Sequence, residues 1–180
     1  MKTSRNNRID TARTVLQGFE RELQNPDPSG LELKVPPIAL GAIAAGLMWF
    51  ASSVLPVFDF PLPGNSAVAA SLALFGILTC LAGVVSFRRA KTTVNPIKPD
   101  STSSLVVSGL YGYTRNPMYL GFLLILLGWA AFLSNGLALL VLPAFFLWIT
   151  RFQISPEERV LASIFADDYA TYRATVRRWL

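Results

Sequence analysis

GLYGYTRNPMYLG, residues 109–121, marks the point where a polar segment of this chain meets a long apolar one. Arg115 is the last charged residue before a run that stays uncharged until Arg151. Asn116 and Pro117 then open a helix, because proline at the first helical position loses no hydrogen bond. Aromatic side chains, an arginine and unpaired backbone groups are therefore expected together where water meets the membrane.

The composition indicates an integral membrane protein. The 180 residues are 52% hydrophobic and 15% charged, with a mean hydropathy of +0.44, whereas soluble domains carry roughly 25% charged residues. The chain has no histidine and a single cysteine, Cys80, inside an apolar run. This excludes a disulfide framework, a Cys/His metal site and a histidine-dependent catalytic triad.

Three uncharged runs predict the membrane helices. The runs from Lys34 to Asp59 and from Asp59 to Arg88 each reach the roughly 20 residues that one span needs. The third, residues 116–150, is too long for one straight span. We expect an all-α integral membrane fold in which four transmembrane helices cross the bilayer.

A tight helical hairpin is expected within the third run. Residues 134–136, Ser-Asn-Gly, divide it into two arms, and Pro143 should kink the second arm because it removes a backbone donor. Amphipathic cytoplasmic helices should flank the spans at both ends of the chain.

The positive charges predict the orientation. Lys and Arg are confined to residues 1–34, to the segment 88–115 and to the segment after residue 150, and the two remaining loops contain neither. By the positive-inside rule, both termini and the middle loop are cytoplasmic. We expect a multi-pass protein of the bacterial inner membrane. Its pI of about 9.7 follows from this topology and from anionic lipid, so it does not indicate a nucleic-acid partner.

The N-terminal segment, residues 1–34, is expected to be cytoplasmic and separate from the membrane domain, residues 35–180. Apolar residues at helical spacing predict an amphipathic helix that lies on the membrane or packs on the C-terminal part; they are Ile9, Ala12, Leu16, Phe19 and Leu23. Residues 25–30 then form a linker.

The C-terminal segment predicts a second amphipathic helix. Ser155 is a good N-cap, Pro156 occupies the first position and Glu158 completes a capping box. Apolar residues follow at spacings of three and four, so this face should press against the membrane or the middle loop; they are Leu161, Phe165, Tyr169, Tyr172, Val176 and Trp179.

Together these motifs resemble the isoprenylcysteine carboxyl methyltransferase and phospholipid methyltransferase family. The resemblance rests on residues 109–121, on the preceding FRRAKTTVNP, residues 87–96, and on PEER at residues 156–159 with Phe165, Tyr169 and Tyr172-Arg173 downstream. It covers roughly residues 70–180, with the catalytic half at about 86–180. The chain departs from the family motif at Leu110, Gly112 and Asn116, where proline, arginine and histidine are common.

The resemblance implies methyl transfer from S-adenosylmethionine by a small helical bundle without a metal. A helix N-terminus favours the cofactor's carboxylate, while Glu157 or Glu158 can pair with its amino group or sulfonium. The alternatives are that the glutamates cap the helix, that Arg115 anchors the chain at the membrane surface, and that Tyr169 and Tyr172 belong to an interfacial belt. The candidate cofactor-binding residues are Tyr111, Tyr113, Arg115, Asn116, Pro117, Met118, Tyr119, Gly121, Glu157, Glu158, Tyr169 and Tyr172.

The acceptor, a lipidic or amphipathic molecule at the cytoplasmic face, decides which side chains act. A carboxylate acceptor needs an arginine clamp, for which Arg173 or Arg151 is available. An amine acceptor must first lose a proton, and a partly buried Glu157 would be the base. Two other functions remain open, a sterol-type reductase that binds NADPH and a non-enzymatic membrane scaffold. A homodimer also remains open.

Overall fold

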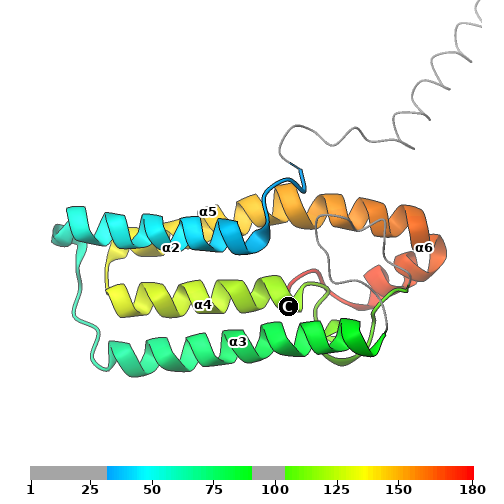
Figure 1. Cartoon of the computed structure of the whole chain (residues 1–180), viewed down its shortest axis with the longest axis horizontal. Coiled ribbons are helices and arrows are strands. Elements are labelled where there is room, and N and C mark those ends of the chain that lie inside the picture. The colour runs from blue at the N-terminus through cyan, green and yellow to red at the C-terminus, as the bar shows by residue number, and fades with distance from the viewer. Residues whose placement is uncertain (1–31, 91–103) are drawn as a thin grey trace, which may run out of the picture. The chain divides into compact units, whose positions relative to one another are not determined.

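The computed structural model describes residues 32–90 and 104–180, and within these it is helical (Figure 1). The predicted N-terminal helix, its linker and most of the middle loop lie outside the described residues. The elements, in chain order, are α2 (Pro37–Val54), η1 (Pro56–Phe58), α3 (Asn65–Arg89), η3 (Gly109–Gly112), α4 (Pro117–Leu133), α5 (Gly136–Ile149), η4 (Thr150–Ile154) and α6 (Ser155–Thr175).

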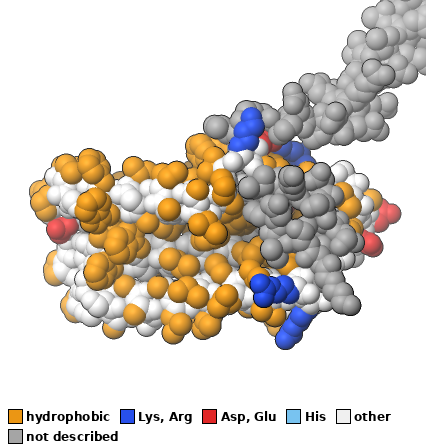
Figure 2. Space-filling model, in the orientation of Figure 1, with side chains coloured by type: hydrophobic (Ala, Val, Ile, Leu, Met, Phe, Trp, Pro, Cys, Tyr) orange, Lys and Arg blue, Asp and Glu red, His pale blue; other side chains and the backbone are white. Residues whose placement is uncertain are grey.

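Three helical segments in the described part of the chain are long and apolar enough to cross a membrane: α2, α3 and the continuous helix that begins at Gly136. The fourth predicted span, α4, is apolar but has only 17 residues. On the face drawn in Figure 2, hydrophobic side chains cover the helical bundle, as expected for a surface in contact with lipid. These features fit the predicted multi-pass membrane protein.

Close backbone contact joins α3 to α4, which lie side by side in Figure 1. A Cβ atom added at Gly76 would lie 2.7 Å from the carbonyl oxygen of Gly121, and one added at Gly128 would lie 2.8 Å from that of Ala69. Such distances leave no room for a side chain. The small residues of α3 and α4 therefore allow the two helices to touch, as membrane helices commonly do.

The predicted hairpin is present, with its turn at the expected residues. Ser134 has a left-handed backbone (φ 48°), and Asn135 accepts hydrogen bonds from Leu137 N and Ala138 N at the start of α5. The Asn135 side chain is fully buried and donates to Asp59 Oδ1 at 2.7 Å. This hydrogen bond connects the turn to the loop between α2 and α3.

Pro143 lies inside α5, which runs on to Ile149. The change from α-helical geometry comes later, in η4, a π-helical segment that joins α5 directly to α6. Pro156 explains the position of this π-helical segment. A proline within a helix has no N–H to donate to the carbonyl four residues earlier, and the proline ring crowds that carbonyl. This carbonyl is that of Phe152, and it accepts a hydrogen bond from Leu33 N at 3.1 Å instead.

The predicted capping box at the start of α6 is wrong. The helix is already continuous through η4, so Ser155 does not begin it, and the Ser155 hydroxyl donates to Thr150 O at 2.8 Å. The amides that a cap would satisfy already lie inside a helix. In this chain the residues from Ser155 to Glu158 stand where α-helical geometry returns after the π-helical segment. The residue types alone do not distinguish such a return from the start of a new helix.

Candidate active site

The start of α4 is joined to the end of the chain. Arg115 N donates to Arg177 O at 3.0 Å, and the Asn116 side chain donates to Arg178 O at 2.9 Å. The helix α6 ends at Thr175, earlier than its apolar pattern suggested, and the tail that follows runs beside residues 114–116. Asn116 therefore holds the C-terminal tail with its side chain and leaves the first turn of α4 uncapped.

The apolar face of α6 packs against the end of the middle loop, which was one of the two expected partners. Tyr169, Tyr172 and Val176 form a buried cluster with Leu105 against it. The Tyr172 hydroxyl donates to Tyr111 O at 2.8 Å and so connects α6 to η3. These tyrosines thus hold α6, η3 and the end of the middle loop together.

Glu158 lies between two arginines. Its carboxylate is 3.3 Å from Arg115 and accepts hydrogen bonds from Arg178 at 2.6 and 3.1 Å. The side chains of Glu158 and Arg115 are only 10% and 9% exposed. Arg115 Nη1 is also 3.5 Å from the Tyr169 hydroxyl, and its Nε has no hydrogen-bond partner among the described residues. We call these four residues the arginine cluster.

Glu157 faces a different set of partners. One carboxyl oxygen, Oε1, accepts hydrogen bonds from the Tyr119 hydroxyl at 2.5 Å and from Gln153 Nε2 at 2.8 Å. Burial raises the pKa of Glu157 to about 7, while the two hydrogen bonds lower it and the nearby charge of Glu158 raises it. A carboxyl group with such a pKa can both hold and release a proton near neutral pH.

The tyrosines around the site stay protonated. Burial raises the pKa of Tyr111 first, and the nearby Glu157 carboxylate raises it further. Burial likewise raises the pKa of Tyr169 to about 12 and that of Tyr172 above its usual value. They can therefore donate hydrogen bonds or stack, but they do not act as bases at neutral pH.

Most of the predicted site residues meet at this end of the bundle, and several do not. Tyr113 is 78% exposed, and Arg173 is exposed. Gly121 and Met118 pack against α3, where Cβ atoms added at Gly121 and Gly83 would collide with Cys80 and Met118. Pro117 is buried at the start of α4.

Arg151 has a partner that sequence reasoning missed. It forms an ion pair with Glu32 at 2.6 Å, and Arg159 pairs with the same carboxylate. Gln153 and Arg178 were missed as well. The only sequence signal for Gln153 is its position four residues before Glu157, which places both on one helix face.

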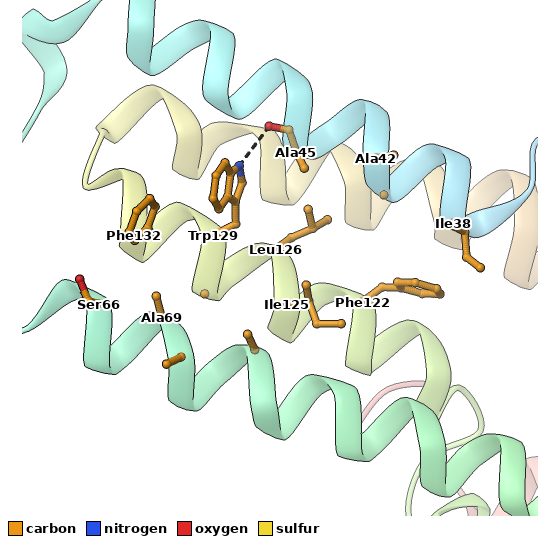
Figure 3. A pocket seen from close by; sticks show the side chains of 14 residues that line it. Ile38, Ala42, Ala45, Ser66, Ala69, Phe122, Ile125, Leu126, Trp129 and Phe132 are labelled. Carbon is orange, nitrogen blue, oxygen red and sulfur yellow. Dashed lines mark hydrogen bonds between the residues drawn. The ribbon is translucent and has the colours of Figure 1, made fainter.

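A groove of about 700 Å³ lies between α2, α3 and α4 and shares no residue with the sets around Glu157 and Glu158 (Figure 3). Its wall is almost wholly apolar, with Ser66 at one end, and Trp129 contributes its ring while its N–H donates to Ala45 O at 3.1 Å. The groove lies within the apolar part of the bundle.

Comparisons with known proteins point to one family. The sequence model described as phospholipid methyltransferase matches residues 65–168. The chain is 36% identical to the protein-S-isoprenylcysteine O-methyltransferase of Schizosaccharomyces pombe over 79 residues. These residues make up 44% of this chain and 34% of that protein. The Saccharomyces cerevisiae protein of the same name is 35% identical over 80 residues, 44% of this chain and 33% of its own length.

A third relative is covered over its whole length. An uncharacterized protein of Haemophilus influenzae is 52% identical over 63 residues, which is 35% of this chain. By contrast, the chain spans about one third of the two yeast methyltransferases.

Proposed function

Since the chain belongs to the phospholipid methyltransferase family, we propose that it is a membrane methyltransferase that takes its methyl group from S-adenosylmethionine. The acceptor is a carboxylate or an amine of a lipidic or amphipathic molecule, bound at the cytoplasmic face. The catalytic half is the part from about residue 86 to residue 180. The observation that carries this proposal is Glu157, a partly buried carboxyl group held by Tyr119 and Gln153 beside the start of α4.

The residues at this end of the bundle fit the charged groups of the cofactor. The uncapped first turn of α4 and the unpartnered Arg115 Nε both favour an anion, so we assign them to the cofactor's carboxylate. The free oxygen of Glu157 suits its amino group or sulfonium. When bound, S-adenosylmethionine supplies a methyl carbon, whose bond to sulfur breaks as the acceptor's oxygen or nitrogen bonds to it.

The chain's own contribution is positioning and the exclusion of water. Glu158 already pairs with both Arg115 and Arg178, and Glu32 engages Arg151. A carboxylate acceptor would therefore rely on Arg173, which is exposed. An amine acceptor would give its proton to Glu157, whose raised pKa suits a base.

Calorimetric titration of the purified protein in detergent tests the proposal. We expect binding of S-adenosylmethionine and S-adenosylhomocysteine but not of NADPH. Preference for NADPH would support the reductase alternative, and a folded sample that binds none of the three would support a scaffold. In a second titration Glu157→Gln should weaken S-adenosylhomocysteine at least tenfold, because an unpaired charged hydrogen bond costs roughly 1.5–3 kcal/mol.

A further inference from the structure

The π-helical segment η4 decides which side chains of α6 face α4. One residue inserted into an α-helix turns all later side chains by about 100° around the axis. Gln153 lies in this segment and is buried, and Glu157 follows four residues later. Both side chains therefore point to the same side, where Tyr119 of α4 meets them.

The two oxygens of the Glu157 carboxyl group have different surroundings. Oε1 receives both hydrogen bonds, from Tyr119 at 2.5 Å and from Gln153 at 2.8 Å. Oε2 receives none from the described residues. Two donors on one oxygen fix the plane of the carboxyl group and leave the other oxygen available.

The titratable and charged groups that face Glu157 come from α4, η3 and α6. Tyr119 faces it from α4 and Tyr111 from η3, and Glu158 is its neighbour on α6. The charge of Glu158 is balanced by Arg115 from the loop before α4 and by Arg178 from the C-terminal tail. Gln153 is the one uncharged, non-titrating side chain that donates to this carboxyl group among the described residues.

We propose that Gln153 is a positioning residue: it holds one oxygen of Glu157 toward Tyr119 and leaves the other oxygen to the bound reactants. As a donor to the charged form, it also keeps Glu157 ionised at a lower pH than the site would otherwise allow. The expected effect of Gln153 on ligand binding rests on the proposed function. The hydrogen bonds that hold Glu157 do not depend on which ligand binds.

Ionisation of Glu157 in the ligand-free protein provides the first measurement. Infrared difference spectra of ¹³C-glutamate-labelled protein, with Glu157→Gln as the reference, give the midpoint of its titration. Gln153→Met has nearly the same length but no donor, and it should raise the midpoint by about one pH unit. Gln153→Lys places a cation there and should lower the midpoint. Ser163→Ala, on the exposed side of α6, is the matched control and should leave it unchanged.

Affinity for S-adenosylhomocysteine provides the second measurement. Gln153→Met should weaken binding near the midpoint, and the loss should shrink at pH 9, where Glu157 is ionised in both proteins. A merely structural role would give a loss that does not depend on pH. If circular dichroism shows that Gln153→Met does not fold, the Gln153→Lys variant tests the positioning role instead. A lowered Glu157 midpoint in that variant would support the role, and an unchanged or raised midpoint would overturn it.

The outcomes separate the two proposals. An unchanged Glu157 midpoint in the folded Gln153 variants would overturn the positioning role, even if the wild-type protein binds S-adenosylhomocysteine. Shifted midpoints in a protein that binds neither S-adenosylmethionine nor S-adenosylhomocysteine would leave the positioning role standing and overturn the cofactor assignment.

Discussion

Ala166 has a backbone conformation that is costly for any residue with a Cβ atom. It lies inside α6 with φ 37° and ψ −108°, where the helix departs from helical geometry. Such strain costs on the order of 1–3 kcal/mol, and glycine avoids much of it. Ala166→Gly should therefore raise the free energy of unfolding by about 1 kcal/mol.

Denaturation of the purified protein in detergent measures this effect. Ala162→Gly is the matched control, since Ala162 is exposed on the same helix with no such strain. It should lower stability by about 0.5–1 kcal/mol, the usual cost of glycine in a helix. Losses of similar size at both positions would show that residue 166 is not strained.

Glu157 should make stability depend on pH. Its pKa is about 7 in the folded protein, against 4.5 as its ordinary value, so the folded state binds more protons between these values. Its contribution is fully present below about pH 4.5 and is lost as the pH rises through 7. Relative to Glu157→Gln, which does not titrate, the wild-type protein should lose stability across this window. A constant difference between pH 4.5 and 7.5 would contradict the burial of this carboxyl group.

At the scale of elements, the contact between α3 and α4 leaves no space for added atoms. Gly76→Ala would place a methyl group against the backbone of α4, and overpacking of this kind costs about 1–3 kcal/mol. Gly46→Ala, in α2, is the matched control because nothing lies within 4 Å of its added Cβ. Melting temperatures should fall for Gly76→Ala and stay at or slightly above the wild-type value for Gly46→Ala, since alanine suits a helix better than glycine; equal values would mean that the helices are not in contact there.

Hydrophobic periodicity and charge predicted the positions of the described helices well, but they predicted the connections between helices less well. The start of α4 at Pro117 and the turn at residues 134–136 were correct because proline and the Ser-Asn-Gly sequence act locally. The capping box was wrong because Pro156 can either begin a helix or widen an existing one, and only the partner of the Phe152 carbonyl, Leu33 N, distinguishes these cases.

The residue types of the candidate site could be predicted from the sequence, but the pairings between these residues could not. Glu157, Tyr119 and Arg115 follow from the resemblance, whereas Gln153 and Arg178 depend on how η4 and the C-terminal tail fold back. Arg178 lies 20 residues after Glu158, and a contact over that separation leaves no periodic trace in one sequence. Glu158 had two interpretations, capping or binding. Its partners, Arg115 and Arg178, contradict capping, and its binding role stays a prediction.

For the whole molecule, the segregation of Lys and Arg predicts that both termini and the middle loop are cytoplasmic. The structure identifies residues suited to a labelling test. Val57, in the loop after α2, is 79% exposed, and Ala170, on α6, is exposed as well. Asn135 is unsuitable, although it lies in the other outer loop, because its buried side chain holds the hairpin turn.

Single cysteines at these two positions, in a Cys80→Ala background, should therefore respond differently to an impermeant thiol reagent. Val57→Cys should be labelled on intact cells, because its loop contains no Lys or Arg and is therefore expected to face outward. Ala170→Cys should be labelled only after the membrane is permeabilised, since α6 carries the arginines that remain inside. The reverse pattern would invert the topology, and it would move Glu157 and the arginine cluster to the outer face, away from cytoplasmic S-adenosylmethionine.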